Sequence, residues 1–151
     1  MRTEFSVEID RPIDEVFEFT IEHVAEWSST VVEDEVIDEK PDYVGTTFRC
    51  LTMERGQRME FLGTVTRHEP PRVSTAYLVG PSFDIDVEYT FEEISGGTRV
   101  TQRSSIKGKG ITKMVLFLMG WLMKKSACKA VAAELDNLKR ILEERAGEVP
   151  A

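Results

Sequence analysis

The chain has 151 residues, of which 41% are hydrophobic and 30% are charged, and its net charge is −8. This length matches a single domain spanning residues 1–151, which can bury a core without disulfide or metal staples. The composition is too apolar for a disordered chain and too charged for a membrane-embedded bundle. Because the negative charge repels phosphate backbones, we expect no nucleic-acid partner.

The amino terminus and the two cysteines indicate a cytoplasmic protein. The opening residues MRTEFSVEID alternate between polar and apolar types, which argues against a signal peptide. The longest apolar run, 114–123, is about half of the roughly 20 residues that a membrane-spanning helix requires. Cys50 and Cys128 fit no metal or redox spacing, so we predict two buried free thiols in a reducing compartment, no metal and no cofactor.

The first part of the chain predicts a strand followed by a short helix. Phe5, Val7 and Ile9 alternate with polar neighbours, as in a half-buried strand over residues 3–10. Pro12 suits the first turn of a helix, because that position needs no N–H donor. Apolar residues then recur at helical spacing, so a helix is expected over 12–26.

The middle of the chain predicts an antiparallel sheet. Turn-forming clusters rich in Gly, Pro, Asp and Ser recur at hairpin intervals. They separate six strand-like runs, at 31–38, 45–54, 58–68, 72–79, 83–94 and 98–107. Connections this short join antiparallel neighbours. The run 83–94 alternates most regularly between apolar and polar residues, so we expect one dry and one solvated face.

The final segment, over residues 111–145, predicts one long amphipathic helix. It contains no proline, and its apolar residues recur in steps of three, four and seven. They are Phe117, Trp121, Cys128, Val131, Leu135, Leu138 and Leu142. This stripe is the largest remaining apolar surface, so we expect it to cover the dry face of the sheet. The predicted order is strand, helix, six strands and a long helix.

This order, together with particular stretches of sequence, resembles the START-like (SRPBCC) superfamily and its polyketide cyclase/dehydrase-like branch. The stretches are IDRPIDEVFEFTIE at 9–22, EW at 26–27, GTVTRHEPPRV at 63–73, YTFEEISGGTRVTQ at 89–102 and AAELDNLKRILEE at 132–144. The resemblance covers nearly the whole chain. It implies an α+β helix-grip fold, in which a curved antiparallel sheet of seven strands wraps around the carboxy-terminal helix in the order β-α-β6-α.

The resemblance also implies an apolar cavity between the sheet and the carboxy-terminal helix. Members of the superfamily bind, carry or transform lipids, polyketides, hormones and other hydrophobic molecules. They share no catalytic motif, so no catalytic residue is carried over to this chain.

Two sets of residues are candidates for lining such a cavity. The apolar wall is expected from Phe48, Met59, Phe61, Phe83, Phe117 and Trp121. The polar candidates are Tyr77, Tyr89, Gln102 and Ser104, which share the apolar phase of their strands. A buried polar group needs a partner, and a few such groups orient ligands in apolar pockets. The alternative interpretation is core packing for the first set and internal hydrogen bonding for the second.

Catalytic residues remain unassigned by the sequence. It contains no G-x-S-x-G, phosphate loop or H-E-x-x-H motif, and His23 and His68 have no catalytic partner in the pattern. The predicted function is therefore binding of a small hydrophobic ligand, such as a lipid or polyketide. One alternative is a polyketide cyclase or dehydratase in which Tyr77, Tyr89 or Gln102 moves protons. Another is a lipid-handling protein that docks on anionic membranes.

The stretch KGKGITKMVLFLMGWLMKKSACK, residues 107–129, combines an apolar helix with a collar of lysines. A helix that is apolar all round is buried or meets another apolar surface. The flanking lysines Lys107, Lys109, Lys113, Lys124 and Lys125 favour peripheral contact with an anionic membrane. The interpretation that we prefer over membrane contact is that one side of this helix faces the cavity and the other faces a loop or the second subunit of a homodimer.

Overall fold

A computed structural model describes residues 1–54 and 56–148, and its elements follow the predicted order. The elements are β1 (Arg2–Ile9), α1 (Ile13–Glu22), α2 (Val24–Trp27), β2 (Val31–Asp38), β3 (Thr47–Glu54), β4 (Gln57–Glu69), β5 (Val73–Val79), β6 (Phe83–Ile94), β7 (Gly97–Gly108) and α3 (Ile111–Glu148). The predicted first helix is divided in two at His23, whose backbone φ of −126° and ψ of 38° leave the helical region.

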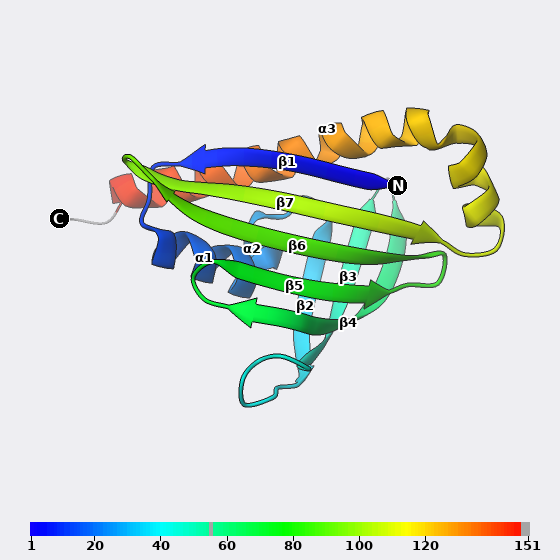
Figure 1. Ribbon diagram of the computed structural model, residues 1–151, viewed down its shortest axis with the longest axis horizontal. Coiled ribbons are helices and arrows are strands. Elements are labelled where there is room, and N and C mark those ends of the chain that lie inside the picture. The colour runs from blue at the N-terminus through cyan, green and yellow to red at the C-terminus, as the bar shows by residue number, and fades with distance from the viewer. Residues whose placement is uncertain (55, 149–151) are drawn as a thin grey trace.

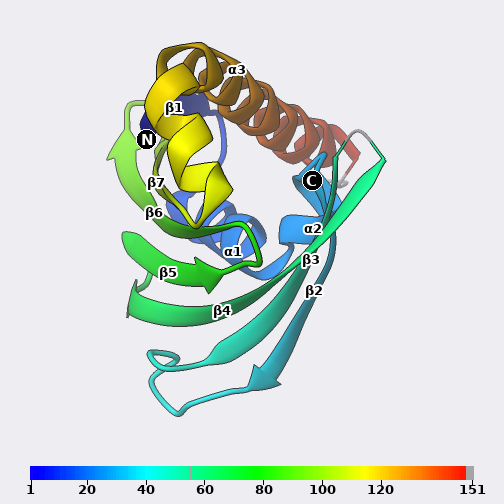
Figure 2. The ribbon, with the colours of Figure 1, turned by 90° about the vertical axis from the view of Figure 1, so that its right-hand side faces the viewer.

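The seven strands form one antiparallel sheet in the order β1-β7-β6-β5-β4-β3-β2. Hairpins join β2 through β7 in sequence, and β1 pairs with β7, so that Val7 lies opposite Val100. Figure 2 shows that the sheet curves into an open cup, with α1 and α2 against its concave side. The chain therefore has the helix-grip α+β fold.

The main core lies where β1, β6 and β7 meet α1 and the carboxy-terminal half of α3. Leu135, Leu138 and Leu142 of α3 are completely buried there, as are Val16 of α1 and Val100 of β7. Their spacing of three and four residues places the three leucines on one face of the helix. The predicted stripe is therefore confirmed for this half of α3.

The amino-terminal half of α3 differs from the prediction. Phe117 and Trp121 are 87% and 74% exposed. Figure 1 shows that α3 runs along β1, while its first turns bend away and project past the end of the sheet. Gly120 lies in this half and lowers the cost of bending. The expectation that the whole stripe covers the sheet is wrong here, because these turns extend past the end of the sheet.

The carboxylate of Glu134 fastens the connection between α2 and β2 to α3. It accepts hydrogen bonds from the hydroxyl of Ser28 at 2.9 Å and from the backbone N–H and hydroxyl of Ser29 at 3.0 and 2.8 Å. The backbone N–H and hydroxyl of Thr30 donate to it as well, each at 3.2 Å. This connection leads directly into β2, which forms one side of the candidate site.

No helix within the described residues has the length and apolar character needed to span a membrane.

Candidate functional site

An apolar cavity of about 170 Å³ lies between the concave face of the sheet and the helices α1 and α2. Ile21 and Val24 line it from the helices, and Val65, Leu78 and Val87 line it from the sheet. Among the described residues that line it, none belongs to α3. The expected position, between the sheet and the carboxy-terminal helix, is therefore corrected, because α3 packs over β1 and β7 at one edge of the sheet.

Thr20 brings an unpaired hydroxyl to the cavity. The residue is 1% exposed, and its Oγ1 atom has no hydrogen-bond partner among the residues that the structure describes. A buried hydroxyl without a partner costs about 1–3 kcal/mol. A bound molecule with a polar group would remove that cost, so Thr20 favours a ligand that is not purely hydrocarbon.

Asp34 is the acidic residue of the cavity lining, and a bulge in β2 brings it there. The pairing of β2 with β3 is irregular between Val31 and Glu33. A bulge shifts the alternation of a strand by one residue. Asp34 consequently lines the cavity, while Glu33 pairs with Arg49 at 3.3 Å on the other face. Desolvation by the surrounding wall raises the pKa of the Asp34 carboxyl from 3.8 to about 6, although the residue as a whole is exposed.

The remaining titratable groups of the lining are neutral donors at neutral pH. Burial raises the pKa of the Cys50 thiol to about 12 and also raises the pKa of the Tyr89 hydroxyl. Desolvation, followed by the charges of Glu22, Asp34 and Glu39, raises the pKa of Tyr43. No basic side chain occurs among the described residues that line the cavity. The site therefore offers hydroxyl and thiol donors and one carboxylate.

His68 is outside the cavity lining and packs against the ring of Tyr43, with 4.5 Å between the ring centroids. Its Nδ1 is 3.3 Å from the hydroxyl of Ser74, a residue that lines the cavity. Desolvation lowers the pKa of His68, which Glu22 partly offsets. The imidazole is therefore neutral at neutral pH and supports the wall of the cavity.

Two of the predicted lining residues, Phe48 and Tyr89, line this cavity. The ring of Phe48 lies over Gly63, where a Cβ atom would stand only 2.3 Å from Phe48 Cζ. Tyr89 packs edge-on against Trp27 with 6.4 Å between the ring centroids. These two residues give the cavity its aromatic surfaces on β3 and β6.

Three further candidates fill the neighbouring part of the concave face. Phe61 is buried, and Met59 and Phe83 pack against it. The ring centroids of Phe61 and Phe83 are 5.5 Å apart. They pack in a second apolar cluster with Cys50 and Leu78, so they support the cavity instead of lining it.

Gln102 and Ser104 lie together on β7, next to the cavity but outside its lining. Gln102 faces Tyr89 across the β6–β7 pairing and donates from Nε2 to the hydroxyl of Ser104 at 3.3 Å. Its Oε1 is buried without a hydrogen-bond partner among the described residues. The internal hydrogen bond matches the alternative interpretation for this pair.

Tyr77, Phe117 and Trp121 lie away from the cavity. Ala76 and Leu78 of β5 line it, so the alternation of the strand directs Tyr77 to the outer face, where its hydroxyl donates to Asp84 at 3.0 Å. The prediction for Tyr77 is wrong. Because β5 carries apolar residues on both faces, its sequence pattern does not show which face is buried. Phe117 and Trp121 are exposed on the projecting turns of α3, as described above.

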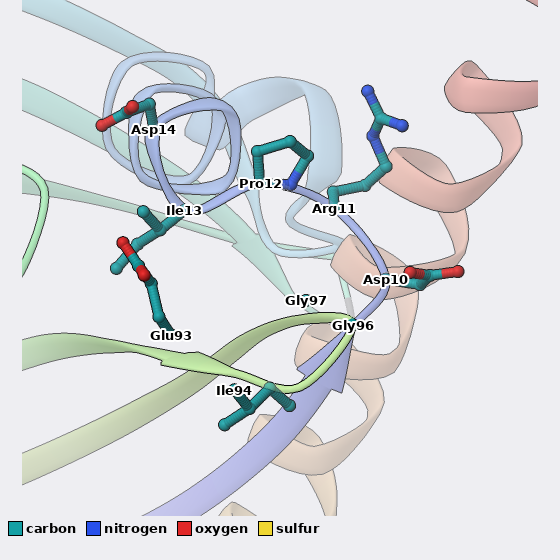
Figure 3. Close-up of a pocket in the computed structure, with 9 residues that line it drawn as sticks. All are labelled: Asp10, Arg11, Pro12, Ile13, Asp14, Glu93, Ile94, Gly96 and Gly97. Atoms are coloured by element: carbon teal, nitrogen blue, oxygen red, sulfur yellow. The ribbon is translucent and has the colours of Figure 1, made fainter.

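Two other features are weaker candidates. The hollow between the β1–α1 connection and the β6–β7 turn is open to solvent and lined by charged residues, and Figure 3 shows Asp10 and Arg11 pointing away from Glu93. On the surface of α1, Glu18, Glu22 and His23 bring possible ligand atoms within 4.8 Å of one another. Exposed acidic groups often cluster in this way without binding an ion, so neither feature matches the cavity as a site.

Comparisons with known proteins agree with this architecture. A family model described as polyketide cyclase / dehydrase and lipid transport matches residues 1–143. A protein from Thermus thermophilus has a similar structure, with a TM-score of 0.76 at 17% identity, covering 93% of this chain and 95% of that one. A START superfamily protein from Mycobacterium smegmatis gives 0.71 at 14% identity, with 99% of each chain covered.

The di-domain ARO/CYC protein StfQ of the steffimycin biosynthetic pathway is also similar, with a TM-score of 0.75 at 14% identity. The match covers 97% of this chain and 52% of that one. Among curated protein sequences, none matches significantly. Identities this low indicate a shared fold and leave the ligand to be argued from the cavity.

Proposed function

Because the chain belongs to the polyketide cyclase / dehydrase and lipid transport family, we propose that it binds a small hydrophobic molecule between the sheet and α1–α2, as one ligand-binding domain over residues 1–151. The observation that carries this proposal is the apolar cavity of about 170 Å³ with the unpaired hydroxyl of Thr20 in its wall. A few polar groups in an otherwise apolar hollow orient a ligand without requiring a charged partner.

The volume limits the size of the ligand. An engineered apolar cavity of about 150 Å³ in another protein holds benzene. A cavity of about 170 Å³ therefore admits a single ring or a short hydrocarbon segment. Pockets for drug-sized molecules measure about 300–1,000 Å³. A polyketide or a long lipid would enter only after Phe48 or the neighbouring helices α1 and α2 move.

The charge of the lining favours an uncharged ligand. Asp34 is ionised at neutral pH, and none of the described lining residues is basic. Burying a ligand carboxylate beside Asp34 would be costly, because neither charge would have a partner. A ligand hydroxyl, by contrast, can bond to Thr20 Oγ1 or donate to Asp34. We therefore expect neutral, hydroxyl-bearing aromatic or aliphatic molecules to bind better than acids of the same size.

Thermal unfolding in the presence of phenol, toluene and benzoate tests this proposal. A ligand at about 100 times its Kd stabilises the folded state by about 2.7 kcal/mol. Phenol and toluene should raise the melting temperature saturably, and benzoate should have little effect.

The matched variants are Ala76→Phe, which fills the cavity, and Val79→Phe, which adds the same side chain on the exposed face of the same strand. The phenol response should disappear only in the first. An equal response in both variants, or no response to any neutral compound in ligand-free protein, would remove the proposal.

A polyketide cyclase or dehydratase is the second candidate function, and Asp34 is the observation that favours it. A general base works best when its pKa is near the working pH, and the pKa of Asp34 is about 6. The neutral hydroxyl of Tyr89 is a possible proton donor on the same cavity. Substituting Asp34→Asn should then abolish turnover of a candidate polyketide while phenol still binds. If the wild-type protein converts no such compound, the enzyme hypothesis has no support.

A further inference from the structure

The amino-terminal half of α3 exposes a large apolar face. Its five most exposed apolar side chains are Ile111 (83%), Met114 (66%), Phe117 (87%), Leu118 (67%) and Trp121 (74%). At about 100° per residue, they lie within about 120° of one another on one side of the helix. We call these five residues the α3 apolar face. Large contiguous apolar surfaces are rarely exposed on monomeric proteins, and those that are exposed often mark a site of interaction with a protein or a membrane.

The α3 apolar face lies in the most basic part of the chain. Residues 94–133 contain eight Lys or Arg and no Asp or Glu, whereas the rest of the chain holds all 27 acidic residues and 11 basic ones. Lys113 lies inside the exposed segment, and Lys124 and Lys125 follow it by one turn. The segment that carries the α3 apolar face is therefore positive in a chain that is otherwise strongly negative.

The basic groups near the face are available to a partner. Among the residues that the structure describes, no carboxylate pairs with Lys113, Lys124 or Lys125. Lys109 differs, because its Nζ is 2.8 Å from Asp84 and donates to the carbonyl of Gly80 at 3.0 Å. Figure 1 shows the first turns of α3 projecting past the end of the sheet, so a flat surface can approach them.

We propose that the α3 apolar face docks on the interface of an anionic phospholipid membrane. The apolar side chains would enter the boundary between head groups and acyl chains, and the lysines would contact lipid phosphates. Long lysine stems allow this, because they cover apolar surface while the ammonium group stays in the polar layer. The acidic remainder of the protein is repelled by the same membrane, which orients the molecule with α3 toward the lipid.

A second copy of the chain fits this face less well. A twofold dimer would place the same patch of each subunit against the other. The lysines of one copy would then face the lysines of its partner, and such like-charge contacts are unfavourable. An anionic surface satisfies both the apolar side chains and the positive charges. This inference goes beyond ligand binding in the cavity, since the two surfaces share no residues.

Vesicle co-sedimentation tests the proposal. The full chain is mixed with vesicles of phosphatidylcholine alone or of equimolar phosphatidylcholine and phosphatidylglycerol. Binding should occur with the second kind only and should weaken as salt is raised. Trp121 reports the contact, because it is exposed while Trp27 is 1% exposed. Tryptophan emission should shift to shorter wavelength on binding, and that shift should vanish in Trp121→Phe.

Two sets of variants separate the apolar and charged contributions. Phe117→Ser combined with Trp121→Ser should reduce partitioning into anionic vesicles by at least about tenfold. The charged contribution is tested by a triple variant that combines Lys113→Gln, Lys124→Gln and Lys125→Gln. Partitioning of this variant should fall by about a hundredfold, because each lysine contributes about fivefold. The matched controls are Leu62→Ser, which is 53% exposed on the sheet, and Lys40→Gln, which pairs with Asp38. Both controls should bind vesicles like the wild type.

Several results would overturn the proposal. These are equal sedimentation with neutral and anionic vesicles, equal losses in the control variants, or a dimer in solution that the serine variant abolishes. Because every substituted residue lies outside the cavity, the phenol response of the variants should remain unchanged. A variant that loses vesicle binding and keeps its phenol response shows that α3 binds the membrane independently of the cavity. Failure of the wild-type protein to respond to phenol, with vesicle binding intact, would count against the cavity proposal alone.

Discussion

Substituting Asp34→Asn should stabilise the protein at alkaline pH and leave it nearly unchanged in acid. The folded state raises the pKa of this carboxyl from 3.8 to about 6. Between these values the folded state binds a proton that the unfolded state has lost, so stability falls as the pH rises through this window. Above about pH 6 the carboxylate is ionised in both states, and its full desolvation cost opposes folding.

The size of the effect follows from the same shift. Raising a pKa from 3.8 to about 6 corresponds to about 3 kcal/mol. Because part of Asp34 reaches solvent, screening reduces the expected gain to about 1 kcal/mol. Urea unfolding at about pH 4 and about pH 8 measures it. The midpoint should rise at about pH 8 only, with an unchanged slope.

Glu35→Gln is the matched control for this experiment. It removes the same charge from the neighbouring position of β2, where Glu35 lies 3.5 Å from Arg49 and Arg49 keeps Glu33 as a partner. Its effect should be small and unfavourable at about pH 8. A stability change in Asp34→Asn that is the same at both pH values, or that is unfavourable at about pH 8, would show that burial of the Asp34 carboxylate does not oppose folding.

Two other substitutions test the walls of the site. Glu134→Ala removes the acceptor of five donor groups at residues 28–30. Hydrogen bonds to a charged group contribute about 1.5–3 kcal/mol each in favourable cases, so urea unfolding should show a free energy of unfolding lower by about 2 kcal/mol. A loss below about 0.5 kcal/mol would mean that this carboxylate does not fasten β2. Gly63→Ala places a Cβ atom 2.3 Å from the ring of Phe48, so the ring must move, at a cost of about 1–3 kcal/mol. The phenol-induced thermal shift should change in this variant and stay the same in Gly120→Ala, where an added Cβ atom meets nothing within 4 Å beyond its chain neighbours and the helix backbone.

Much of the fold could be predicted because local patterns determined it. The alternation of residues 83–94 predicts β6 with its observed bounds, and the leucines at 135, 138 and 142 predict the buried face of α3. These patterns reflect burial on one face, which sequence periodicity records directly. The sequence does not reveal the helix break at His23, since no glycine or proline marks it.

The candidate site was less predictable, because it depends on contacts between distant segments. Asp34 reaches the cavity through a bulge that the alternation of β2 does not reveal. The pattern of β5 does not show which face Tyr77 occupies, since the strand has apolar residues on both faces. The apolar character of Phe117 and Trp121 predicts contact with something apolar, but it does not say whether the partner belongs to the chain.

A methyl NMR titration with phenol tests the location of the ligand most directly. We expect saturable chemical-shift changes for the methyl signals of Ile21, Val65, Leu78 and Val87, which line the cavity. The methyl signals of Leu135, Leu138 and Leu142, which are buried in the main core, should not shift. Shifts at the leucines of α3 without shifts at the cavity, or no shifts at either, would contradict a ligand site between the sheet and α1–α2.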